Sequence, residues 1–134
     1  MRSLLSVVLG YVVMLAAVLA GQVAFSAFAS GLTAQPGQQP DTFYFVFNLI
    51  MGFFYLIIGG YVTALLAGYW ELEHALGLAT LSIVMCIVSM VKYPADQPLW
   101  YSITLISLSI PGAFIGGQYR VRQVKGERAP ILAD

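Results

Sequence analysis

The chain has 134 residues, of which 60% are hydrophobic and only 9% charged, whereas an ordinary soluble domain carries about 25% charged residues. So few polar groups could not cover the core of a water-soluble fold, and six basic residues balanced by six acidic ones exclude a nucleic-acid binder with a strongly basic surface. The composition therefore predicts an integral membrane protein, with the lipid bilayer as its first partner.

Four apolar stretches are long enough, or nearly so, to cross a bilayer, which takes about 20 residues. Because backbone polar groups in lipid must bond within their own segment, each stretch is expected to be a helix. We expect an all-α, polytopic membrane protein with one transmembrane domain over residues 1–134 and its helices in an antiparallel bundle. The expected helices cover about 4–29, 43–70, 75–91 and 99–119, followed by a basic tail at 120–134.

The first segment allows two interpretations. A basic start, an apolar run and the residues Ala27-Phe28-Ala29 are typical of a cleaved signal peptide. The apolar run is longer than the roughly 7–15 residues usual in such a signal. We favour a retained helix, and cleavage after Ala29 stays open as the alternative.

Small residues recur at four-residue spacing in three segments, a pattern that lets helix backbones approach closely in lipid. The first segment has Ala16, Ala20 and Ala24 at this spacing. In the second and fourth segments, the expected helix-packing residues are Gly60, Ala64, Gly68, Gly112, Gly116, Ala113 and Gly117.

These two segments also resemble each other. Residues 58–61, with the sequence IGGY, align with residues 111–114, with the sequence PGAF. A duplicated two-helix hairpin would produce this match, and independent acquisition of small packing residues is the alternative. Pro111 removes one backbone hydrogen bond, so a bend in the fourth helix is expected.

Glu71, Glu73 and His74 cluster at the connection between the second and third helices. Glu71 and His74 have the spacing used in di-iron carboxylate bundles, but such sites need a second motif and further Glu ligands. The chain has only one His, so we expect no metal and no other cofactor. The three residues are expected to lie at the membrane interface. There the negative charges of Glu71 and Glu73 stabilise the start of the third helix through its dipole.

No Asp, Glu, Lys or Arg lies at mid-depth in any segment, and no set of nucleophile, base and stabilising groups is present. The protein is therefore not expected to be an enzyme. Ser82, Cys86 and Ser89 share one face of the third helix at helical spacing. These hydroxyls, with the amides of Gln22 and Asn48, either bond between helices or form the polar lining of a path. For the two amides, which must find partners, pairing with each other and a binding role are the two alternatives.

Basic residues are unevenly divided between the two ends of the expected helices. Arg2 and the basic residues of 120–128 lie at one end, and only Lys92 lies at the other. The positive-inside rule then predicts that both termini are cytoplasmic.

The stretch GGYVTALLAGYWELEHALGLATL, Gly59–Leu81, resembles a pattern in small bacterial four-helix integral membrane proteins of unknown function. In those proteins a Gly-Gly-aromatic start leads to a Glu- and His-containing turn and then to a small-residue helix. This chain departs from them in having no Lys or Arg at residues 69–70. The resemblance implies a multi-pass protein of the bacterial inner (plasma) membrane, and it carries no assigned activity.

Two functions remain as hypotheses. The leading one is an accessory or structural subunit that packs against other membrane subunits or against itself, with no nucleic-acid partner. The alternative is a small homo-oligomeric channel or transporter for a small uncharged or anionic solute, lined by Gln22, Asn48, Ser82 and Ser89.

Overall fold

A computed structural model describes residues 2–28, 41–93 and 97–128 of the chain. Four helices are present in these ranges, and each is long and apolar enough to cross a membrane. This confirms the predictions of an all-helical chain and of a multi-pass membrane protein. The helices are α1 Arg2–Phe28, α2 Thr42–Ala67, α3 Glu71–Lys92 and α4 Leu99–Arg128.

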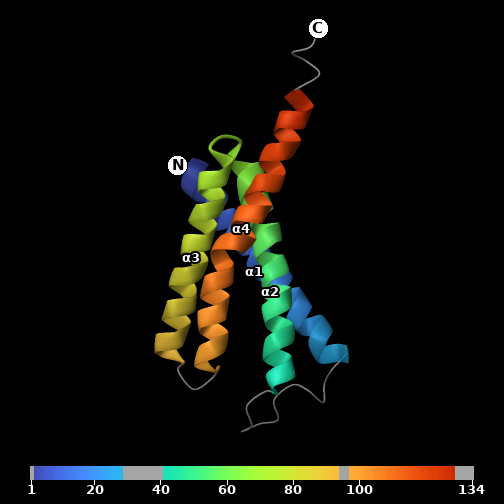
Figure 1. Cartoon of the computed structure of the whole chain (residues 1–134), viewed down its shortest axis with the longest axis vertical. Coiled ribbons are helices and arrows are strands. Elements are labelled where there is room, and N and C mark those ends of the chain that lie inside the picture. The colour runs from blue at the N-terminus through green and yellow to red at the C-terminus, as the bar shows by residue number, and fades with distance from the viewer. Residues whose placement is uncertain (1, 29–40, 94–96, 129–134) are drawn as a thin grey trace.

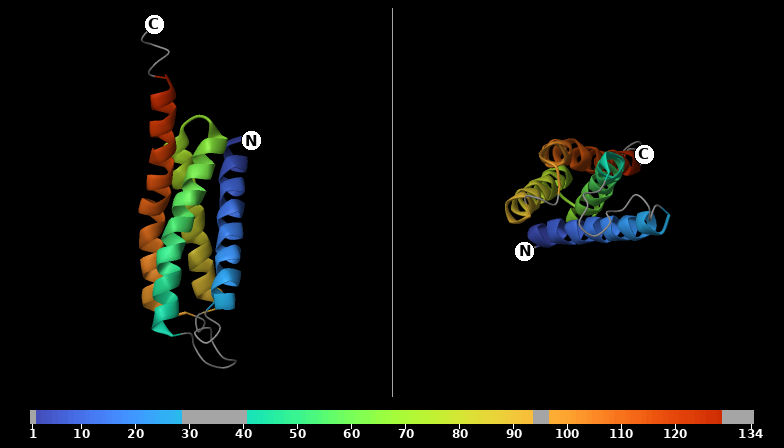
Figure 2. Two further views of the ribbon diagram at one scale, coloured as in Figure 1. Left: turned by 90° about the vertical axis from the view of Figure 1, so that its right-hand side faces the viewer. Right: turned by 90° about the horizontal axis from the view of Figure 1, so that it is seen from below.

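The ends of the helices lie at two levels of the molecule (Figure 1). The turn between α2 and α3 and the start of α1 lie at one end of the molecule, which we call the turn end. The starts of α2 and α4 lie at the opposite end, which we call the loop end. Within the described ranges, α2 contacts all three other helices, whereas α1 and α4 have no contact and lie on opposite sides of the molecule (Figure 2).

Close backbone contact joins α2 to α4. A Cβ atom added at Gly60 would lie 2.5 Å from the carbonyl oxygen of Ala113, and one at Gly116 would overlap the carbonyl oxygen of Ile57. A Cβ at Gly117 would lie 2.7 Å from the Cβ of Ala75, so the same stretch of α4 also meets α3 closely. Of the expected packing residues, these are all buried: Gly60, Ala64, Gly112, Ala113, Gly116 and Gly117.

Gly68 does not extend this packing surface. It is the C-cap of α2 in the left-handed conformation, with φ of 67°, and its N–H bonds to the carbonyl of Ala64 at 3.4 Å. A Cβ atom at Gly68 would meet nothing within 4 Å. Glycine is suited to this position because it adopts positive φ without a steric penalty.

The connection between α2 and α3 is shorter than expected. It consists of residues 68–70, with Trp70 in the left-handed region at φ 49°, and α3 begins at Glu71 rather than at residue 75. Glu71 and Glu73 occupy the first turn of α3, where negative charge favours the helix dipole. The acids and His74 are thus helical residues and not the connection itself.

Helix α4 continues past the expected end at residue 119 to Arg128, because the residues that follow include good helix formers such as Arg, Gln and Lys. Pro111 lies inside this helix, and Figure 1 shows that α4 changes direction between its lower and upper halves. Large apolar side chains are exposed on every helix, among them Leu19, Phe54, Val88 and Ile103. Such surfaces are expected to face lipid.

Candidate functional site

A cavity of about 370 Å³ lies between the four helices, in the half of the molecule nearer the loop end. Its volume is within the range of about 300–1,000 Å³ that is common for small-molecule sites. The apolar part of the lining comprises Met14, Leu15, Val18, Gly52, Leu56, Met85 and Leu105. The polar part comprises Tyr11, Gln22, Asn48, Tyr55, Ser82, Cys86, Ser89, Gln97 and Tyr101.

All four residues expected to form a polar lining are brought together at this cavity. Gln22 comes from α1, Asn48 from α2, and Ser82 and Ser89 from α3. Cys86 lies between the two serines in sequence and lines the same space.

Hydrogen bonds at the mouth of the cavity join α1 to α2. The Nε2 of Gln22 donates to the Oδ1 of Asn48, so the two amides pair with each other. The hydroxyl of Tyr44 donates to Oε1 of Gln22 at 3.1 Å, and Nδ2 of Asn48 donates to the carbonyl oxygen of Tyr44 at 2.9 Å. Each amide therefore has partners for both its donor and its acceptor sides.

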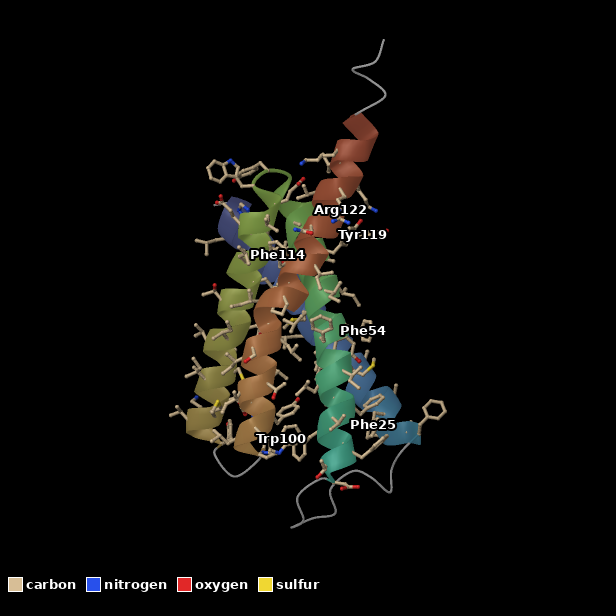
Figure 3. All side chains as sticks on the ribbon, in the orientation of Figure 1. Phe25, Phe54, Trp100, Phe114, Tyr119 and Arg122 are labelled. Atoms are coloured by element: carbon tan, nitrogen blue, oxygen red, sulfur yellow. The ribbon has the colours of Figure 1, made fainter. Side chains whose placement is uncertain are left out.

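A second hollow of about 290 Å³ shares Gln22 and Asn48 with the larger cavity and extends toward the loop end. Across it, Nε2 of Gln97 donates to Oγ of Ser89 at 3.3 Å. Aromatic side chains surround this end, with the ring centroids of Phe45 and Tyr101 5.3 Å apart. Figure 3 shows the same concentration of aromatic rings at the loop end, where Phe25 and Trp100 are labelled.

Helix packing closes the cavity toward the turn end. A Cβ atom at Gly59 would lie 3.0 Å from Leu78 of α3 and 3.1 Å from Met14 of α1. One at Gly10 would overlap the Oγ1 of Thr63 and lie 3.2 Å from the carbonyl oxygen of Gly59. The three helices are therefore in close contact at these positions.

The lining contains neutral hydrogen-bonding groups and no charged side chain among the residues that the structure describes. Within those same residues, no three His, Cys, Asp or Glu side chains are grouped in a way that could hold a metal ion. The arrangement is suited to binding through hydrogen bonds and apolar contact, because amides, hydroxyls and phenols both donate and accept.

The cluster of Glu71, Glu73 and His74 lies away from the cavity, at the turn end. His74 is buried, its Nδ1 lies 2.8 Å from the carbonyl oxygen of Trp70, and its ring meets the ring of Tyr69 edge to face at 5.5 Å. These contacts of His74 hold the short turn against the start of α3.

Several lining residues were not singled out from the sequence. Tyr11, Tyr55 and Tyr101 are aromatic residues of apolar segments, which are equally common at lipid-facing positions. Gly21 was also missed, although a Cβ atom there would overlap the hydroxyl of Tyr55. A contact between one glycine and a tyrosine on another helix leaves no pattern in the sequence by which it could be predicted.

No protein-family model matches the chain, and neither a curated protein nor a solved structure matches it. The function is therefore inferred from the cavity, its chemistry and the distribution of charge.

Proposed function

We propose that the chain is an antiparallel four-helix protein of the bacterial inner membrane that binds a small uncharged solute in the central cavity and carries it across the bilayer. The observation that supports this function is a cavity of about 370 Å³ with a neutral, hydrogen-bonding lining within the candidate membrane spans.

The lining favours an uncharged solute. Moving an ion out of water is costly unless an opposite charge or a dense set of hydrogen bonds compensates. The amides of Gln22 and Asn48 and the hydroxyl of Ser82 provide neutral donors and acceptors, and Met14 and Leu105 provide apolar contact. A neutral molecule with polar and apolar parts matches both kinds of surface.

Closure at one end favours a transporter over an open channel. Gly59 packs closely against Leu78, and Gly10 packs closely against Thr63, between the cavity and the turn end. Alternating access exposes a central site to one side of the membrane at a time. One chain provides the whole lining, so the proposed site does not need a second copy of the chain. Self-association of the chain would be a separate property.

The charge distribution suggests which side is open. Arg120, Arg122 and Lys125 lie at the turn end of the bundle, and Lys92 lies at the loop end. By the positive-inside rule the turn end and both termini are cytoplasmic, so the cavity faces the outside.

A second candidate function is that of an accessory subunit. Ala16, Ala20 and Ala24 are exposed on α1, at the four-residue spacing that allows another membrane helix to approach closely. This surface suits a helix of an unlike subunit or of a second copy.

Liposome swelling tests the proposal and separates the two candidates. The full chain is reconstituted, and uptake of urea, glycerol and larger neutral solutes is compared with that of empty liposomes. Asn48→Ala removes a partner of Gln22 at the mouth, so flux should fall by about tenfold. Ser107→Ala is the matched control, because Ser107 is exposed and bonds only to the carbonyl of Ile103.

Flux that is unchanged in Asn48→Ala would show that the transport site is wrongly placed. Liposomes that swell no faster than empty ones would remove the transport function. If the chain is then found with larger unlike subunits in native mass spectrometry after gentle extraction, the accessory role is the correct one.

A further inference from the structure

Ser82 has an unusual hydroxyl for a residue in these helices. It is only 7% exposed, and its Oγ is buried with no hydrogen-bond partner. Several other hydroxyls in the spans bond to a carbonyl one turn earlier, as Thr63 does to Gly59 and Ser109 to Leu105, both at 2.8 Å. The same back-bond to Leu78 is sterically ordinary for a helical serine, yet Ser82 does not make it.

An unsatisfied buried hydroxyl costs about 1–3 kcal/mol, so a polar group that reaches it gains that free energy. Ser82 lines the cavity next to the packing that closes it, since Leu78, one turn earlier on α3, contacts Gly59. Cys86, one turn later, uses its thiol in a contact of 3.9 Å with the carbonyl of Ser102. Among the residues that the structure describes, Ser82 is therefore a cavity-lining residue whose buried hydroxyl has no hydrogen-bond partner.

We propose that Ser82 is the recognition residue for the polar end of the solute, which is an uncharged organic molecule with a hydroxyl or carbonyl oxygen at one end and an apolar body. This inference rests on the proposed solute-binding function of the cavity.

The shape of the cavity supports this class of solute. When the oxygen of the solute lies at Ser82, its apolar body lies between two walls of the cavity. One wall is Met14 and Val18 of α1, and the other is Met85 of α3 with Leu105 of α4. An apolar cavity of about 150 Å³ holds a benzene ring, so a cavity of about 370 Å³ accepts a single-ring molecule with room for substituents. The amides at the mouth are paired with each other and leave Ser82 as the better partner.

Cys86 provides a reporter for occupancy, because it is the only cysteine of the chain and it lines the cavity. The probes are phenol and toluene, which have nearly the same size and differ by a hydroxyl group. The measurement is the rate at which N-ethylmaleimide, an uncharged reagent, modifies Cys86 of the full-length protein in lipid nanodiscs. Phenol and toluene are compared by their concentrations in the lipid phase of the nanodiscs.

In the wild-type protein, phenol should slow the modification at about three- to tenfold lower concentration than toluene, as expected for one net hydrogen bond. Ser82→Ala should remove this preference and leave protection by toluene unchanged. Ser107→Ala should behave as the wild type. The rate of Cys86 modification in Ser82→Ala without any probe shows whether the reagent still reaches the cavity in this variant.

Each other outcome is decisive. Equal protection by phenol and toluene in the wild type would mean that Ser82 is satisfied by water only, and a phenol preference that survives Ser82→Ala would place recognition elsewhere. Both results overturn the role of Ser82 and leave solute binding in the cavity intact. If neither probe slows the modification, the binding function fails together with this inference.

Discussion

Gly68 and Gly60 illustrate how one residue type serves two purposes in the same helix. Both belong to one pattern of small residues at four-residue spacing, yet only Gly60 lies against the backbone of α4. Gly68 instead lets α2 end at φ 67°, so that three residues suffice to reach Glu71. The two residues should therefore respond differently to substitution.

We expect Gly68→Ala to lower the free energy of unfolding by about 1 kcal/mol, because a Cβ atom is strained at positive φ even where space is free. Gly68→Asn should cost less, since asparagine tolerates this conformation. Gly126→Ala is the control, because a Cβ atom there also meets nothing within 4 Å and its φ is not positive. Thermal unfolding in detergent measures all three, and equal stability of Gly68→Ala and wild type would contradict the assignment.

At the scale of the helices, the crossing of α2 and α4 brings the two backbones into close contact. Gly60 and Ala113, which are at aligned positions of the two similar segments, lie directly against each other. Gly112 and Gly116 bring the rest of α4 close to Leu56 and Ile57. This contact lies in the half of the molecule nearer the turn end. Duplication of a two-helix hairpin stays a prediction.

Gly116→Ala is expected to lower the free energy of unfolding by about 1–3 kcal/mol, because its Cβ would overlap backbone atoms that cannot rotate away. Gly52→Ala is the matched control, since its Cβ would meet only a Leu105 methyl at 3.8 Å. Unfolding in rising dodecyl sulfate, followed by tryptophan fluorescence, gives both values. A loss as large in Gly52→Ala as in Gly116→Ala would argue against the crossing.

At the scale of the whole molecule, the two ends differ in structure and in charge. The turn end has close packing at glycines and carries Arg120, Arg122 and Lys125, whereas the loop end carries the cavity and Lys92. The proposed function depends on this asymmetry, because a solute must enter from the open side.

The two lysines of the chain, Lys92 and Lys125, provide a direct test of orientation. Both are exposed, one at each end of the bundle. A membrane-impermeant amine reagent applied to intact cells should label Lys92 and spare Lys125, and opening the cells should expose Lys125. Peptide mass spectrometry reads the result, and the reverse labelling would invert the topology and turn the cavity toward the cytoplasm.

Much of the fold was predictable from the order of residues. The thickness of a bilayer and the need to satisfy every backbone group in lipid make length and hydropathy sufficient to predict four helices. Pairing of Gln22 with Asn48 was predictable as well, since isolated amides in apolar segments must find partners. The start of α3 at Glu71 was missed because the charged residues look like a loop, although they form the first turn of the helix.

Only the tertiary structure decided which helices meet and which hydroxyl is left over. A small residue shows that a helix can be approached closely, but not from which side, so Gly60 packs on α4 while Ala16 is exposed on α1. Ser82 and Ser109 are the same residue type in similar apolar surroundings, yet Ser109 bonds to its own helix and Ser82 faces the cavity without a partner. Local sequence determines that a helix forms and how polar each face is, whereas the space left between packed helices depends on all four of them at once.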